Sequence, residues 1–302
     1  MADDKAAARK SAKLIPKREL IKIKKEVSRL RKQGHDIWTD DEIEKAGWTT
    51  DVVSSGLHVN KEKQRQTWDC GLACARMVLL TLDEGAPSYD VLAARVASPS
   101  VWTIDLAYLL SEFGVTCEFI SAAPTMDVAS YSGSAFYAES LAEDAGRVQR
   151  LLAKAAQENV VVRKATLSAA ELWNLMSEEE TLVIALVDAT LLHNRAAASR
   201  AAAAAAAAAA AKGKATPPSS VNYLGHYVLI VGLDDGRGGF VVNDPARDDE
   251  RTFVHAETLE AARCAEGTDQ DLILVPIYEQ STGPTVPPPG EVPKIVRVCG
   301  SR

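Results

Sequence analysis

Hydrophobic and polar positions follow helical and strand-like periods through the middle of the chain, whereas both ends are polar. An almost unbroken apolar run over residues 70–80 predicts a buried helix. The continuous apolar runs 181–187 and 226–233 are typical of strands that are covered on both faces. The remaining pattern predicts helices over 89–96, 103–113, 139–159, 166–177 and 257–264, and strands over 115–120, 160–162, 240–243 and 271–278.

The apolar runs 226–233 and 240–243 are separated by D-D-G-R-G-G, which is a strong hairpin signal. In an antiparallel pair, the start of one strand lies beside the end of the next. His226 opens the first run and Asp244 follows the second, so we expect their side chains to meet at the same end of the pair. The predicted fold class is α+β, with a helix packed against a central antiparallel sheet.

Shifts in composition divide the chain into an extension, a domain and a tail. Residues 1–57 are basic and then acidic, and the acidic part predicts a short helix framed by Trp38 and Trp48. Residues 58–280 carry the periodic pattern of a folded domain. The Pro/Gly-rich tail 281–302 is expected to be disordered.

A low-complexity insert, residues 193–220, interrupts this domain just before His226. It contains the alanine run 201–211, followed by a stretch rich in Lys, Gly, Pro and Ser. Polyalanine favours a helix by propensity. We nevertheless expect the insert to bury nothing specific and to be a mobile surface insertion without chemistry, the alternative being a flap over the substrate.

Composition and charge exclude several classes of protein. Hydrophobic residues make up 47% and charged residues 25% of the chain, as in globular proteins with a sizeable core. The net charge of −7 argues against nucleic-acid binding. No apolar stretch approaches the roughly 18 residues of a membrane span, and no signal-peptide pattern follows the N-terminus. Five scattered cysteines indicate reduced thiols in the cytoplasm, while N-terminal lysines leave nuclear localisation open.

Cys70 is the candidate nucleophile. Asp69 is a suitable N-cap residue, which places Cys70 in the first turn of the helix over 70–80. The partial positive charge of a helix N-terminus favours a thiolate there. The alternative is that Cys70 is a small buried hydrophobic residue. Cys74, one turn further on, fits the core or a regulatory disulfide with Cys70, and no further ligands with zinc spacing accompany the two.

His226 is the candidate base. A polar ring that opens an apolar strand is costly without a partner. Asp244 is the candidate partner, although N-D-P is also a turn-forming triplet and the amide of Asn243 can orient a histidine too. Gln64, in the loop before Cys70, can donate its amide to an oxyanion, with Gln66 as the rival. Cysteine, histidine and carboxylate together predict nucleophilic catalysis.

Five motifs resemble those of the guanylyl cyclase domain-containing proteins of animals, plants and protists. The resemblance extends over about residues 59–278. The motifs are Q-x-x-x-W-D-C-G-L-A-C-A-R-M-V-L (64–79), V-W-T-I-D-L-A-Y-L-L (101–110), G-H-Y-V-L-I-V-G (225–232), N-D-P-A (243–246) and G-T-D-Q-D-L-I-L-V (267–275). The family is named for guanylyl cyclase activity, yet the resemblance implies a papain-like fold similar to the bacteriocin-processing, C39-type cysteine peptidases.

Three functional hypotheses follow. The first is a cysteine hydrolase that acts without a cofactor on a peptide or other acyl substrate through Cys70, His226, Asp244 and Gln64. The second is a guanylyl cyclase that uses Mg²⁺ or Mn²⁺ with GTP, although the sequence has no P-loop and its aspartates form no pattern. The third is a non-catalytic binding module that engages a protein partner through its N-terminal segment.

Overall fold

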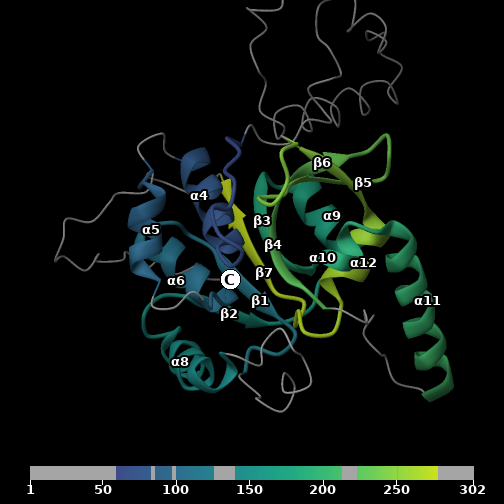
Figure 1. Ribbon diagram of the computed structural model, residues 1–302, viewed down its shortest axis with the longest axis horizontal. Helices are drawn as coiled ribbons and strands as arrows, with labels where there is room; N and C mark the ends of the chain where they lie inside the picture. Colours follow the sequence, from purple (N-terminus) through teal and green to yellow (C-terminus); the bar gives the residue numbers. More distant parts are fainter. Residues whose placement is uncertain are drawn as a thin grey trace, which may run out of the picture.

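The computed structural model describes residues 59–82, 86–96, 100–125, 140–212, 223–249 and 251–277 (Figure 1). The predictions for the extension 1–57 and the tail 281–302 lie outside these residues. No helix within the described ranges is long and apolar enough to cross a bilayer.

The described residues form a seven-stranded sheet with the strand order β2-β1-β7-β3-β4-β5-β6. The edge strand β2 is parallel to its neighbour β1, and every other neighbouring pair is antiparallel. The strands are β1 (Glu118–Ser121), β2 (Val161–Lys164), β3 (Thr181–Asp188), β4 (Gly225–Asp234), β5 (Gly239–Asn243), β6 (Thr252–His255) and β7 (Leu272–Pro276).

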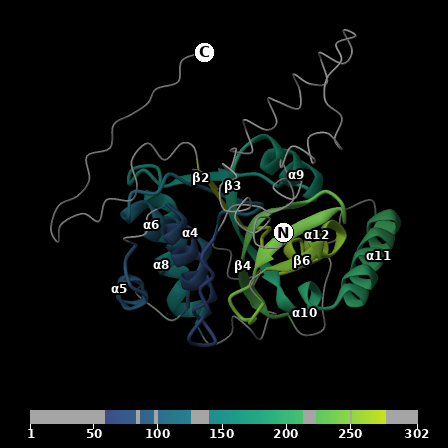
Figure 2. The same cartoon turned by 90° about the horizontal axis from the view of Figure 1, so that it is seen from above.

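Helices cover both faces of the sheet, which gives three layers (Figures 1 and 2). Side chains alternate along β3: Leu182, Ile184 and Leu186 face one core, while Val183 and Ala185 face the other. The first core packs against α4 (Cys70–Leu82), α5 (Tyr89–Arg95), α6 (Thr103–Glu112) and α8 (Leu141–Lys154). The second packs against α9 (Ala169–Glu178), α10 (Ala189–Leu192), α11 (Arg195–Lys212) and α12 (Ala256–Arg263).

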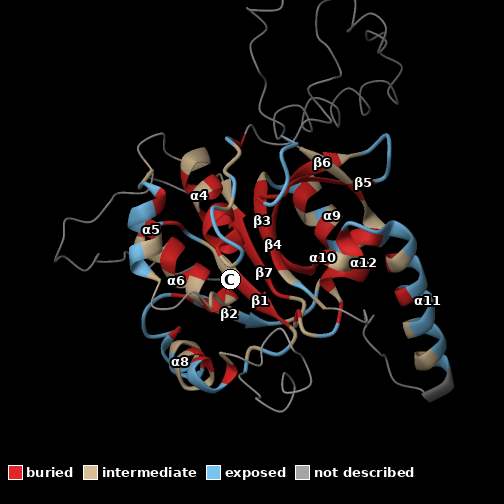
Figure 3. Cartoon of the chain, viewed as in Figure 1, coloured by how far each residue is buried: buried red, intermediate tan, exposed pale blue. Residues whose placement is uncertain are grey.

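The continuous apolar runs are buried along their whole length, as the pattern predicts. All eight residues of β3 are buried, because helices lie on both sides of this central strand (Figure 3). The predicted hairpin is present as β4 and β5, with Asp234 opposite Gly239 at the turn. Gly238 in this turn has a φ of 65°, a conformation that favours glycine. The α+β class and the helix on a largely antiparallel sheet are therefore confirmed.

Four features differ from the sequence predictions. The strand β6 and the short helix α10 were not predicted, and the pairing of β1 with β2 is parallel. The expectation that the alanine-rich insert buries nothing specific is wrong, because α11 buries Ala198 and Ala201 in the second core. Methyl side chains allow this helix to approach α10 and α12 closely, so helix propensity and docking act together.

Candidate active site

Cys70 is the first residue of α4 and is only 6% exposed. The backbone N–H of Tyr227, in β4, donates to the Cys70 sulfur at 3.5 Å. Gly71 lets the helix approach α6 and β4, because a Cβ there would lie 2.9 Å from Leu106 Cδ1 and 3.1 Å from Tyr227 Cδ2. Close packing between α4 and β4 therefore sets the position of the sulfur.

The carboxylate of Asp69 bonds to the loop that precedes it and not to the first turn of α4, as an N-cap side chain would. It accepts hydrogen bonds from the backbone N–H of Gln66 at 2.9 Å and of Arg65 at 3.1 Å. The prediction that Asp69 caps the helix through its side chain is wrong, because these earlier backbone donors compete for the same oxygens. Asp69 instead holds the loop that contains Gln64 and Gln66 against the start of α4.

His226 lies at the start of β4, opposite Val187 of β3, and is buried. Its Nε2 is 2.8 Å from Oδ1 of Asp244, the contact expected from the hairpin. Burial alone would lower the pKa of His226. The hydrogen bond with Asp244 and the interaction with the Cys70 sulfur outweigh burial and raise that pKa to about 9.

Asp244 is buried and receives hydrogen bonds on both carboxylate oxygens. In addition to His226, it accepts the backbone N–H of Ala246 on Oδ1 at 2.9 Å and His193 Nε2 on Oδ2 at 2.7 Å. Burial alone would raise its pKa, but the hydrogen bonds from the two histidines hold that pKa well below its usual value. Asn243 is directed elsewhere, because its amide nitrogen lies 3.8 Å from the sulfur of Met77.

Sequence reasoning missed His193 because it placed this residue in the low-complexity insert. His193 is the C-cap residue of α10, whose N-cap Asp188 accepts the backbone N–H of Thr190 at 2.9 Å. Its side chain is 37% exposed, whereas that of His226 is 8% exposed. The available signal was D-A-T-L-L-H, a capping residue followed by one helical turn that ends in histidine. The site thus joins α4 on one face of the sheet to α10 on the other.

Gln64 lies in the loop before α4, next to the residue that follows Asp244. Its backbone N–H donates to the carbonyl of Pro245 at 3.1 Å. Its side-chain amide donates to the carbonyl of Gln66 at 2.8 Å, and its Oε1 is buried without a hydrogen-bond partner. Gln66 is exposed. The loop therefore brings Gln64, not Gln66, inward beside the end of β5, with one amide hydrogen uncommitted.

Cys74, Asp105 and Asp234 do not form a second catalytic centre that would suit the cyclase hypothesis. Cys74 is a free thiol whose burial raises its pKa well above the usual value. Asp105 pairs with Arg147, and Asp234 pairs with Arg237 in the β4–β5 turn. Within the described ranges, no three His, Cys, Asp or Glu side chains are grouped as a metal site requires. These residues do not fit a Mg²⁺ or Mn²⁺ site.

Comparison with known proteins assigns the part of the chain that contains this site to a family. The model of a family described as "Guanylylate cyclase" matches residues 59–275, which include Cys70, His226 and Asp244. The chain belongs to this family. The family member "Guanylyl cyclase 1" of Arabidopsis thaliana is 33% identical over 222 residues, which is 74% of this chain and 77% of that protein. The predicted family resemblance is therefore confirmed.

A solved structure described as a C39-like peptidase from Bacillus anthracis is also similar. The match has a TM-score of 0.40 and 12% sequence identity, and it covers 72% of this chain and 94% of the other. A similarity of this strength assigns no activity to the family member described here.

Proposed function

We propose that this protein is a cysteine hydrolase that cleaves an acyl or amide bond. The observation that carries the proposal is the position of His226, which interacts with the Cys70 sulfur and with Asp244 at once. Because Nε2 bonds Asp244, we expect Nδ1 to be the ring nitrogen that exchanges the proton with the sulfur. A nucleophile, a base and a group that orients the base are the parts that acyl transfer requires.

In the proposed reaction, the thiolate of Cys70 attacks the substrate carbonyl while His226 carries the proton. The C–S bond forms, and collapse of the tetrahedral intermediate expels an amine or alcohol that takes the proton from His226 Nδ1. Water, deprotonated by the same nitrogen, then hydrolyses the thioester and restores the thiol. Asp244 keeps the ring oriented, and the uncommitted amide hydrogen of Gln64 is the proposed oxyanion donor.

The test is the pH dependence of iodoacetamide labelling, followed residue by residue with peptide mass spectrometry. A reference thiol titrates near pH 8.5. We expect Cys70 to react rapidly well below that pH, and His226→Ala to remove this advantage. Cys117 and Cys264 are internal controls, because burial raises the pKa of Cys117 to about 12 and that of Cys264 to about 11. Cys70 labelling with the profile of an ordinary thiol in both proteins would reject the hydrolase.

Guanylyl cyclase activity is the second candidate, supported by the name of the Arabidopsis relative. It predicts formation of cyclic GMP from GTP that depends on Mg²⁺ or Mn²⁺ and persists in Cys70→Ala. An assay of cyclic GMP formation from GTP therefore separates the two functions. Turnover that is lost on removal of the metal but not in Cys70→Ala supports the cyclase. Absence of both activities would leave the binding-module hypothesis, whose N-terminal segment lies outside the described residues.

A further inference from the structure

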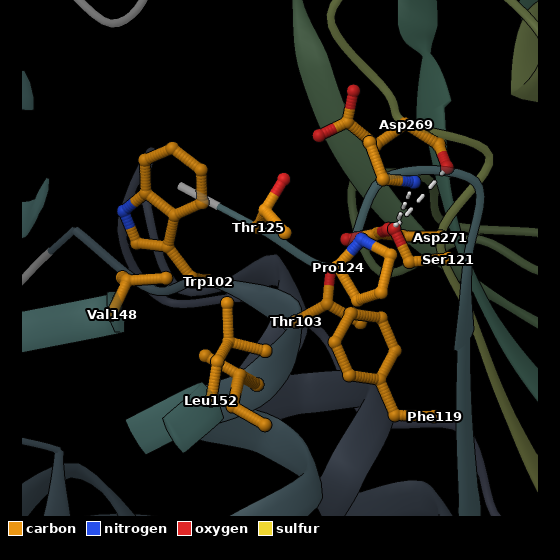
Figure 4. Close-up of a pocket in the computed structure, with 12 residues that line it drawn as sticks. Trp102, Thr103, Phe119, Ser121, Pro124, Thr125, Val148, Leu152, Asp269 and Asp271 are labelled. Atoms are coloured by element: carbon orange, nitrogen blue, oxygen red, sulfur yellow. Dashed lines mark hydrogen bonds between the residues drawn. The ribbon is translucent and has the colours of Figure 1, made fainter. Parts of the chain in front are cut away.

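A hollow lies at the N-terminal end of α6, on the face of the sheet that also carries α4 (Figure 4). In the close-up, Asp271 and Ser121 lie on the side opposite Trp102. Most of the wall is apolar and is formed by Trp102, Ile104, Phe119, Pro124, Val148 and Leu152. The hollow therefore offers apolar surface along its wall and a carboxyl group at one side.

Tyr227 connects the hollow to the nucleophile. Its backbone N–H donates to the Cys70 sulfur, and its hydroxyl is 2.9 Å from the hydroxyl of Thr103. Thr103 is the first residue of α6 and lines the hollow. Tyr227 therefore contacts both the nucleophile and a residue of this wall, which places the hollow one side chain beyond Tyr227 along the sheet.

Asp271 is the residue of the hollow whose carboxyl group lacks a hydrogen-bond donor at one oxygen. It precedes β7, is 8% exposed, and interacts with the side chains of Thr103 and Ser121. Its Oδ1, however, has no hydrogen-bond partner. An unpaired oxygen on a buried carboxyl is costly, so a donor from outside would be favoured there. Asp269 also lines the hollow and adds negative charge, which opposes ionisation of Asp271 and attracts a cation.

We propose that this hollow binds an alkylammonium or alkylguanidinium group of the substrate. The apolar wall would contact the aliphatic stem, the indole of Trp102 would favour a cation near its face, and Asp271 Oδ1 would accept hydrogen bonds from the charged end. The inference rests on the proposed hydrolase function. It adds a substrate class, namely acyl compounds with a lysine-like or arginine-like side chain near the bond that is cleaved.

The experiment uses dipeptidyl vinyl sulfones that label Cys70 and differ only in one side chain. Lysine is compared with norleucine, which has a similar stem but no charge, at each of the two positions nearest the electrophile. At pH 8 we expect the lysine probe to react about tenfold faster at one position, the effect of one charge-assisted hydrogen bond. Asp271→Asn should abolish this ratio, and Asp235→Asn, in the exposed β4–β5 turn, should keep it.

The ratio of the two rates should also depend on pH. Burial raises the pKa of Asp271 to about 7, so the carboxylate that attracts the cation forms above that pH. The groups that act on Asp271 are Asp269, Thr103 of α6 and Ser121 of β1, and only Asp269 among them carries charge. Because both probes react with the same sulfur, titration of His226 cancels in the ratio. The lysine preference should therefore increase between pH 6 and pH 8.

Iodoacetamide separates failure of this inference from failure of the hydrolase. It carries no side chain for the hollow, so its rate at Cys70 should be equal in the wild type and both variants. If Cys70 reacts as an ordinary thiol, the hydrolase itself is rejected. If Cys70 is reactive but lysine and norleucine are equal at both positions, or Asp271→Asn keeps the preference, the cation pocket is wrong. The wild-type comparison alone suffices should a variant fail to fold.

Discussion

Two buried carboxyl groups at the same end of the sheet, Asp244 and Asp271, have opposite properties. Asp244 follows β5 and receives hydrogen bonds from two histidines and a backbone N–H, which hold its pKa well below the usual value. Asp271 precedes β7, has one oxygen without a partner, and has a pKa raised to about 7. Burial raises the pKa of both carboxyls, but at Asp244 the donors, two of them histidines, outweigh it, whereas at Asp271 they do not and Asp269 adds to it.

The largest expected effect is that of Asp244→Asn. The change removes the negative charge beside His226, whose pKa should fall, and leaves two histidines facing an amide. We expect the free energy of unfolding at pH 7 to fall by about 4 kcal/mol, as when one member of a buried pair is removed. Urea denaturation measures this loss. Since the lowered pKa of Asp244 stabilises the fold above the unfolded value, the difference should shrink below about pH 4.

Asp271→Asn should increase the free energy of unfolding at neutral pH, opposite to the effect of Asp244→Asn. A raised pKa means that the folded state retains a proton that the unfolded state releases above about pH 4. Stability therefore falls as the pH rises towards 7, and by pH 6 the loss is about 3 kcal/mol. The asparagine variant lacks this loss, so its stability should be flat over the range in which the wild type weakens. A wild-type profile without this slope would contradict the raised pKa.

Thr103→Val sharpens the comparison by removing a donor from Asp271. The threonine hydroxyl lowers the pKa of Asp271 and contacts the hydroxyl of Tyr227. Valine has a similar shape, so packing should change little. Loss of the hydroxyl donor should lower the free energy of unfolding by about 2 kcal/mol at neutral pH and move the titration of Asp271 above pH 7. The midpoint of the pH-dependent stability, compared with that of the wild type, reports the shift, and Asp271→Asn provides the baseline without this titration.

The smallest effect is expected for His193→Ala, which removes one donor from Asp244. Because His193 is partly exposed, solvent screens the pair, and we expect a loss of about 1 kcal/mol. His226 should become less well oriented, so labelling of Cys70 by iodoacetamide should slow several-fold. His193→Gln retains an N–H donor and should restore much of the rate. Equal rates in both variants and the wild type would show that His193 has no positioning role.

The sequence allowed prediction of those parts of the site that lie on continuous local patterns. His226 and Asp244 belong to one hairpin, so their meeting follows from antiparallel geometry. Cys70 was selected as the candidate nucleophile because it begins the apolar run over residues 70–80. The direction of the Asp69 carboxylate could not be predicted, because backbone donors on both sides of this residue compete for it.

His193 and Asp271 could not be found in this way. The bond from His193 to Asp244 requires α10 to pack on the second face of the sheet, a long-range contact that composition hides. Asp271 looks like the polar end of a strand, and its significance appears only when the packing of α6 and β1 buries it. Both cases depend on tertiary contacts and not on periodicity.

The connection between β3 and β4 has a consequence for how the chain tolerates changes in length. Its two ends are fixed side by side, because Asp188 pairs with Gly225 and the backbone N–H of Ala189 donates to the carbonyl of Leu224 at 2.9 Å. For a connection with fixed ends, each doubling of length costs only about 0.6 kcal/mol of closure entropy. Insertions and deletions in the alanine run beyond Ala201 should therefore be nearly neutral, whereas a single deletion before His193 would rotate that histidine away from Asp244.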